Sequence, residues 1–215
     1  SSAHVTSKPR WTKRQLEVAF AACYGTTSGG SVDIDYVAAA FGVTRRTVQR
    51  WLRGSPREKA AIPATRLQQL QYPLPEIRRI EQQALANART VLKGLDLPRG
   101  RGVRKEWRDR QWMDPHVVAI LRPHGSTRLQ QVAIARGAPR PVAALHKRGP
   151  LDDFVTVPTR FHADVLVGEI LDRVGPWRLY PDNSIVESGR TRVWAAWAPR
   201  VDLSAVARTA ELLQN

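Results

Sequence analysis

The sequence predicts two domains joined by a helix: a small all-α N-terminal domain, a linker helix and a mixed α+β C-terminal domain. Helical periodicity and helix-capping residues recur throughout residues 12–93, whereas short β-branched apolar runs alternate with helical stretches after Pro115. The chain has 215 residues, which is enough for two small hydrophobic cores. We place the domain boundaries at residues 1–60, 61–97 and 98–215.

The N-terminal part contains three helical patterns, each with its own start and stop signal. In the first pattern, Leu16, Phe20 and Cys23 recur at the spacing that places them on one helical face. Side chains of Ser, Thr and Asp cap helix starts, and glycine commonly ends a helix. The start caps are Thr12, Asp33 and Thr44, and the stop residues are Gly25, Gly42 and Gly54.

Prolines divide the linker. Pro63 suits the first position of a short helix that continues over 64–71, and a longer helical pattern runs from Pro75 to Lys93. Such an amphipathic helix needs a partner surface, which is either the protein's own domains or a second copy in a two-helix seam. The apolar stripe of this helix is Ile77, Ile80, Ala84, Ala88 and Val91.

The C-terminal part has the alternation of an α+β fold. The 129–136 segment fits the return strand of a hairpin, although Leu129, Val132 and Ala133 also fit a helix. Asp202 is a suitable cap for the last helix. The expected elements are strands over 117–121, 154–157, 177–180 and 192–198, and helices over 160–174 and 203–213.

The composition is strongly basic. There are 34 Lys and Arg against 19 Asp and Glu, which gives a net charge of +15, and 28 of the basic residues are Arg. A protein this basic typically binds a polyanion, either nucleic acid or an acidic membrane surface. The charge is +8 over residues 1–96 and +7 over 97–215, so both parts are expected to face the polyanion; the alternative is charge that serves solubility alone.

Several classes of protein are excluded. The single cysteine, Cys23, rules out an intrachain disulfide and a cysteine-based zinc site. No apolar run approaches the roughly 20 residues of a membrane span, and the first residues lack a secretory signal, so we expect a cytoplasmic protein with no membrane partner. Because the sequence has no glycine-rich phosphate loop and no ligand cluster, no cofactor, metal or small-molecule substrate is expected.

Residues 35–52 carry the strongest local motif, two short helices joined by a turn. Ala38 is small where the helices would cross, and Gly42 suits a turn that needs a positive φ. Helical periodicity turns Val43, Val48, Trp51 and Leu52 inward, so the intervening basic and polar residues must point outward.

This outward face has the chemistry of a helix that reads the DNA major groove. Arginine can bind guanine O6 and N7 together, and glutamine can bind adenine N6 and N7. We expect some of these side chains to read bases and the others to bind phosphates; the alternative is a solvated basic face. The candidate DNA-binding residues are Thr44, Arg45, Arg46, Thr47, Gln49, Arg50 and Arg53.

The basic second half predicts a second contact with the same duplex. The 19-residue linker pattern over 75–93 spans roughly 28 Å at about 1.5 Å per residue, close to the ~34 Å of one turn of DNA. One chain could therefore read a long asymmetric site as a monomer; dimerisation through the linker stripe is the alternative. The candidates here are Arg99, Arg101, Arg104, Lys105, Arg108, Arg140, Lys147 and Arg148.

The unit over 43–52, Val-Thr-Arg-Arg-Thr-Val-Gln-Arg-Trp-Leu, together with the size, the linker helix and the Arg/Trp-rich second half, resembles the immunity repressors of the cluster A mycobacteriophages. The specific motif covers about a tenth of the chain. The resemblance implies a transcriptional repressor that maintains lysogeny and superinfection immunity in the cytoplasm of a bacterial host, near the nucleoid. It implies binding to short asymmetric operator sites, called stoperators, with 98–215 as the second DNA-binding domain.

Two other functions compete with this one. The motif also resembles excisionase modules that bend DNA in recombination, but these are usually smaller than this chain. A nuclease or recombinase would need clustered catalytic groups; Asp152 and Asp153 are adjacent on an expected strand and so point to opposite faces. His162 is expected on the exposed face of its helix. The prediction is therefore a DNA-binding protein and not an enzyme.

Overall fold

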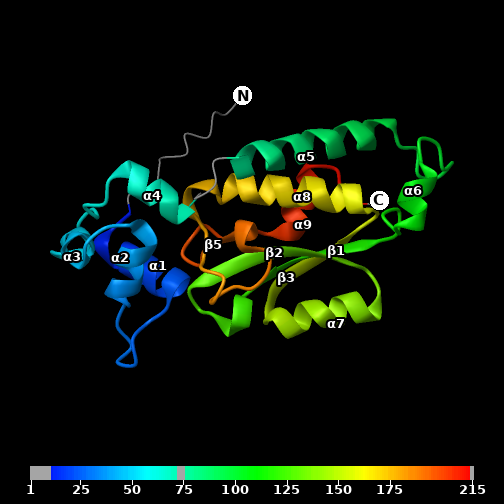
Figure 1. Cartoon of the computed structure of the whole chain (residues 1–215). Helices are drawn as coiled ribbons and strands as arrows, with labels where there is room; N and C mark the ends of the chain where they lie inside the picture. Colours follow the sequence, from blue (N-terminus) through cyan, green and yellow to red (C-terminus); the bar gives the residue numbers. More distant parts are fainter. Residues whose placement is uncertain (1–10, 72–75, 214–215) are drawn as a thin grey trace.

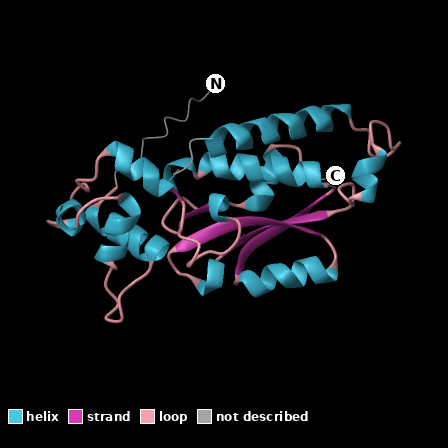
Figure 2. Ribbon diagram, viewed as in Figure 1, coloured by secondary structure: helices cyan, strands magenta, loops and turns pink. Residues whose placement is uncertain are grey.

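A computed structural model describes residues 11–71 and 76–213 of the chain. A helical N-terminal half, α1–α5, is followed by a mixed α+β region built on a five-stranded antiparallel sheet (Figures 1 and 2). This confirms the predicted change from helices to an α+β texture. Among the described residues, no helix is both long and apolar enough to cross a bilayer.

The N-terminal helices begin where their caps predict. The side chains of Thr12, Asp33 and Thr44 each accept a hydrogen bond from a backbone N–H three residues along the chain. The helices are α1 Lys13–Tyr24, α2 Ile34–Phe41, α3 Arg45–Leu52, α4 Ala64–Gln71, α5 Glu76–Gly94, α6 Lys105–Asp109, α7 Pro139–Arg148, α8 Arg160–Arg173 and α9 Leu203–Thr209.

The sheet has the strand order β3-β1-β2-β5-β4, and every neighbouring pair is antiparallel. β1 and β2 form the predicted hairpin, so the helical alternative for 129–136 is wrong. The last two strands are shorter than the expected 177–180 and 192–198. The strands are β1 His116–Leu121, β2 Leu129–Arg136, β3 Leu151–Val157, β4 Arg178–Leu179 and β5 Val193–Ala195.

Helices cover both faces of the sheet. On β1, Val117 and Ala119 join a cluster with Leu145 of α7, whereas Val118 and Ile120 join the larger cluster around α8 and α9. Figure 1 shows α7 on one face and α8 on the other, with α5 lying outside α8. β1 is therefore buried along its whole length.

The sequence did not predict α7. Its first turn contains Pro139 and Pro141, and prolines usually punctuate loops. Both prolines lie where the helix has no intrahelical partner for a backbone N–H, so they cost the helix no hydrogen bond.

The buried face of α5 differs from the predicted stripe. Leu85, Ala88 and Leu92 pack toward α8, whereas Ile80 is 60% exposed and Ala84 is also exposed. Two arginine pairs flank this face: Glu81 with Arg178, at 2.7 Å, and Arg89 with Glu169. The buried face therefore shares Ala88 with the predicted stripe but is turned toward Leu85 and Leu92.

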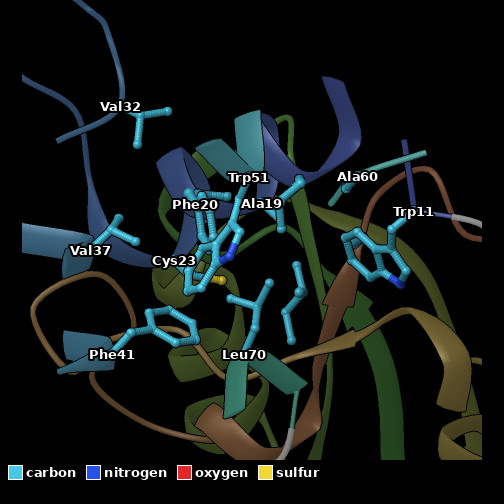
Figure 3. Close-up of a cluster of buried hydrophobic side chains, with 14 of the residues drawn as sticks. Trp11, Ala19, Phe20, Cys23, Val32, Val37, Phe41, Trp51, Ala60 and Leu70 are labelled. Atoms are coloured by element: carbon cyan, nitrogen blue, oxygen red, sulfur yellow. The ribbon is translucent and has the colours of Figure 1, made fainter. Parts of the chain in front are cut away.

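The core of the N-terminal helices continues into the sheet. Phe20, Phe41 and Trp51 pack together (Figure 3), in a cluster that extends to Leu129 of β2 and Val193 of β5. Backbone hydrogen bonds cross the same boundary, from Tyr180 N–H to the carbonyl of Leu70 and from Asp182 N–H to the carbonyl of Cys23. Helices α1–α4 are therefore held against one end of the sheet.

Candidate nucleic-acid interface

The turn between α2 and α3 is tightly built. Gly42 has φ 64°, in the left-handed region that favours glycine, and Val43 N–H donates to the carbonyl of Ala38 at 3.0 Å. Arg66 of α4 donates to the carbonyl of Phe41 at 3.0 Å and so satisfies the end of α2. This geometry fixes the angle at which α3 leaves the turn.

Helix α3 has one buried face and one exposed basic face. Val48 and Trp51 are buried, and Val43 and Leu52 are partly buried against the same cluster. Thr47 is half-buried, and its hydroxyl is 3.0 Å from that of Thr44. The exposed residues are Thr44, Arg45, Arg46, Gln49, Arg50 and Arg53, as the periodicity predicted.

The arginines of this face differ in their partners. Arg45 donates through Nη1 to both carboxylate oxygens of Asp35, at 2.8 and 2.9 Å. In the described part of the chain, Arg46, Arg50 and Arg53 form no ion pair. The face thus presents uncompensated positive charge beside one carboxylate.

Aromatic packing holds the basic segment around α6 on the protein. Trp107 and Trp112 contact Phe161 of α8, with ring centroids 4.7 and 6.0 Å apart. The Arg104 guanidinium lies 5.3 Å from the centroid of Trp107. The predicted residues Arg99, Arg101, Arg104, Lys105 and Arg108 are all exposed on this segment, and Arg99 lies 3.7 Å from Asp96.

The three candidates on α7 have different surroundings. Arg140 and Lys147 are exposed, but Arg148 is half-buried and donates to Gln131 at 2.8 Å. Gln131 in turn donates to the carbonyls of Ser188 and Gly189. Burial lowers the pKa of the Arg148 guanidinium from its ordinary value. Arg148 therefore connects α7 to the segment before β5, a structural contact that the sequence did not predict.

The predicted residues do not gather at one site. α3 lies at one end of the molecule and α6 at the opposite end, with the length of α5 between them (Figure 1). Because the cores are continuous, this separation is fixed by packing and not by a free linker. A single ligand would have to be long and regular to contact both ends.

The groups considered for catalysis have structural partners. Asp152 accepts from Arg122 and from Gln130, both at 3.1 Å, whereas Asp153 accepts from the backbone N–H of Leu203 at the start of α9. No group of three or more His, Cys, Asp or Glu side chains in the described residues is arranged to hold a metal ion.

His162 is half-buried, with Nδ1 2.7 Å from the hydroxyl of Thr159, so its predicted exposed position is wrong. The hydroxyl of Thr159 caps α8 by accepting from the backbone N–H of His162. The same short contact draws the imidazole back against the start of the helix, which the spacing of the sequence did not show.

Two residues near α3 were missed by sequence reasoning. Asp35 lies ten positions before the arginine that it binds, and Arg66 lies in another helix from the carbonyl that it binds. Neither spacing is a recognised motif, so no local signal could have found them.

Comparison of the chain with protein-family models, curated proteins and solved structures finds no match. The functional assignment therefore depends on the residues and their geometry.

Proposed function

We propose that this protein is a sequence-specific double-stranded DNA-binding repressor, in which α2 and α3 form a helix-turn-helix and α3 enters the major groove. The observation that carries the proposal is the two-sided character of α3: arginines and a glutamine on the exposed face, Val48 and Trp51 buried on the other. A recognition helix requires this arrangement, because its base-reading side chains must extend from a rigidly packed support.

The chemistry of the face suits the edges of bases. Arg46 and Arg50 lie at the first and second turns of α3, and Gln49 lies between them, all exposed. Bidentate contacts of arginine with guanine, or of glutamine with adenine, contribute about 1–3 kcal/mol of discrimination each. Cations without a protein partner are also available to phosphates, which supply most of the affinity.

The second half would extend the contact along the same duplex. In this proposal, residues 1–60 form the helix-turn-helix domain, 61–97 the helical linker and 98–215 a second DNA-binding domain. The exposed basic segment around α6 and the exposed Arg140 and Lys147 of α7 support this arrangement. Because the two ends are held at a fixed separation, one monomer would cover a long asymmetric site. Maintenance of lysogeny rests on the resemblance to the phage immunity repressors.

The test is binding of the full chain to DNA selected from a random pool. We expect a complex that contains one 24.1 kDa chain on an asymmetric site. About six phosphate contacts would give a slope near −5 for log affinity against log salt. Two chains on a palindrome would contradict the monomeric arrangement, and equal affinity for selected and random DNA would contradict the proposed function.

Two arginine substitutions distinguish contacts with bases from general attraction to DNA phosphates. Arg46→Ala should lower affinity for the selected site by about 5- to 100-fold while changing affinity for random DNA much less. Arg57, exposed in the loop after α3, should act through phosphate alone, so Arg57→Ala should weaken both by a similar factor. The measurement is competition between the two DNAs at one salt concentration. An identical profile for the two variants would contradict base reading by Arg46.

A further inference from the structure

An exposed carboxylate lies beside the first arginine of α3. Asp35 is in the first turn of α2 and Arg45 is the first residue of α3, so the tight α2–α3 turn brings two helix starts together. The Nη1 group of Arg45 donates to both oxygens of Asp35, at 2.8 and 2.9 Å, while the two side chains remain 57% and 73% exposed.

Stability alone does not account for this pair. An ion pair this exposed contributes about 0–1 kcal/mol. A positive charge at a helix N-terminus is also disfavoured by the helix dipole, and α3 has no acidic residue in its first turn. The consequence of the contact lies in the position of the Arg45 guanidinium, because a long side chain that would otherwise rotate freely is held at one end.

The contact leaves the other edge of the guanidinium available. Within the described residues, Arg45 Nε and Nη2 make no hydrogen bond, and these two N–H groups point in parallel along one side of the planar group. Guanine presents O6 and N7 side by side in the major groove and accepts such a parallel pair. Asp35 and guanine both accept hydrogen bonds, but both contacts of Asp35 are to Nη1, so Nε and Nη2 stay available to the base.

We infer that Asp35 is a positioning residue that holds Arg45 by Nη1 so that Nε and Nη2 read a single guanine. The inference rests on the proposed function and adds the identity of one base in the site. Asp35 itself carries negative charge near the DNA, so it lowers general attraction while raising selectivity. The expected signature is therefore a change in preference at one position without a general loss of affinity.

The experiment compares Asp35→Asn with Glu17→Gln. Glu17 forms the exposed pair of α1 with Arg14, at 3.6 Å, so both variants remove one carboxylate from an exposed ion pair and raise the net charge by one. Affinity is measured for the selected site and for every single-base variant of it, and the melting temperature of each protein is recorded.

For Asp35→Asn we expect guanine preference at one position to fall about five- to tenfold while affinity for random DNA is equal or tighter. Glu17→Gln should keep every preference. Arg45→Lys, which retains charge but loses the planar fork, should lose preference at the same position as Asp35→Asn.

Three results would overturn the inference. In the first, Asp35→Asn keeps the wild-type preference at every position. In the second, preferences fall at all positions together with the melting temperature, which indicates a structural role. In the third, Arg45→Lys affects a different position. A wild-type protein with no base preference would instead overturn the proposed function, and this inference with it.

Discussion

Two histidines of the sheet region lie in surroundings that disfavour their charged form. His116 begins β1, is buried, and has Nδ1 2.7 Å from the carbonyl of Asp114. His162 has Nδ1 2.7 Å from the hydroxyl of Thr159. Burial is the main cause that lowers the pKa of both imidazoles below the ordinary value near 6.5. Protonation therefore costs more in the folded chain than in the unfolded chain.

This difference makes the free energy of unfolding depend on pH. The unfolded chain binds more protons below about pH 6.5, so the contribution of these histidines is full above that pH and is lost as pH falls toward the folded pKa. His162→Gln should flatten the decrease measured by urea unfolding at pH 7.5 and 5.5. A steeper slope in His162→Gln would contradict this sign.

At the scale of single residues, the sequence predicted the features that depend on residues close by in the chain. Caps such as Thr12 and Asp33 act on N–H groups three residues away, and the outward direction of Arg46 follows from helical period alone. The pairing of Asp35 with Arg45, and of Gln131 with Arg148, depends on how elements meet. Candidate site residues could thus be named, but their partners could not.

The close approach of α5 and α8 depends on a glycine. Gly168 lies in the middle of α8, where alanine would favour the helix by about 1 kcal/mol. An added Cβ there would lie 2.8 Å from Cδ1 and 2.9 Å from Cδ2 of Leu85, too close for either atom. The glycine therefore serves helix packing at the expense of helix propensity.

A double-mutant cycle tests this account. Gly168→Ala alone should destabilise the protein by about 1–3 kcal/mol, because the Leu85 side chain must move from its packed position. In a Leu85→Ala background the same substitution should become neutral or stabilising by up to about 1 kcal/mol, since propensity is then the remaining effect. Chemical denaturation of the four proteins gives the coupling. Additive effects would show that Leu85 is not the obstacle.

The elements that the sequence placed poorly are those decided by tertiary contacts. Apolar spacing assigned Ile80 to the buried face of α5, but that face carries Leu85 and Leu92, and Ile80 is exposed. The helix α7 was not predicted because its first turn contains two prolines, and it packs on the sheet through Leu145. Conversely, the hairpin β1–β2 could be proposed because its turn chemistry is local.

In the whole molecule, side chains of the helical half contact side chains of the sheet region. Trp11 packs edge-to-face on Trp197, with ring centroids 5.7 Å apart, and the hydroxyl of Tyr36 donates to Asp182 at 3.0 Å. Gln71 also donates to the carbonyl of Pro176 at 2.7 Å. These contacts position α3 relative to the basic second half. In the proposed function, the fold would therefore set the distance between the two DNA segments that the protein contacts.

These contacts between the helical half and the sheet predict one cooperative unfolding transition for the full chain. Far-UV circular dichroism and tryptophan fluorescence should give coincident melting curves, because the cluster around Phe20 and Trp51 cannot lose the sheet residues and stay packed. Trp197→Ala removes half of the Trp11 contact, so it should cost roughly 2–3 kcal/mol, somewhat less than a fully buried aromatic residue. It should also begin to separate the two curves.

The control for this substitution is Phe154→Ala. Phe154 is an aromatic residue on the edge strand β3 and is 61% exposed, so its removal should change stability by no more than about 0.5 kcal/mol and leave the curves coincident. Separate transitions in the wild-type chain would show that the two halves unfold independently. In that case the linker would set the distance between α3 and the second basic region. DNA sites that differ in the distance between their two contacted segments should then bind with equal affinity.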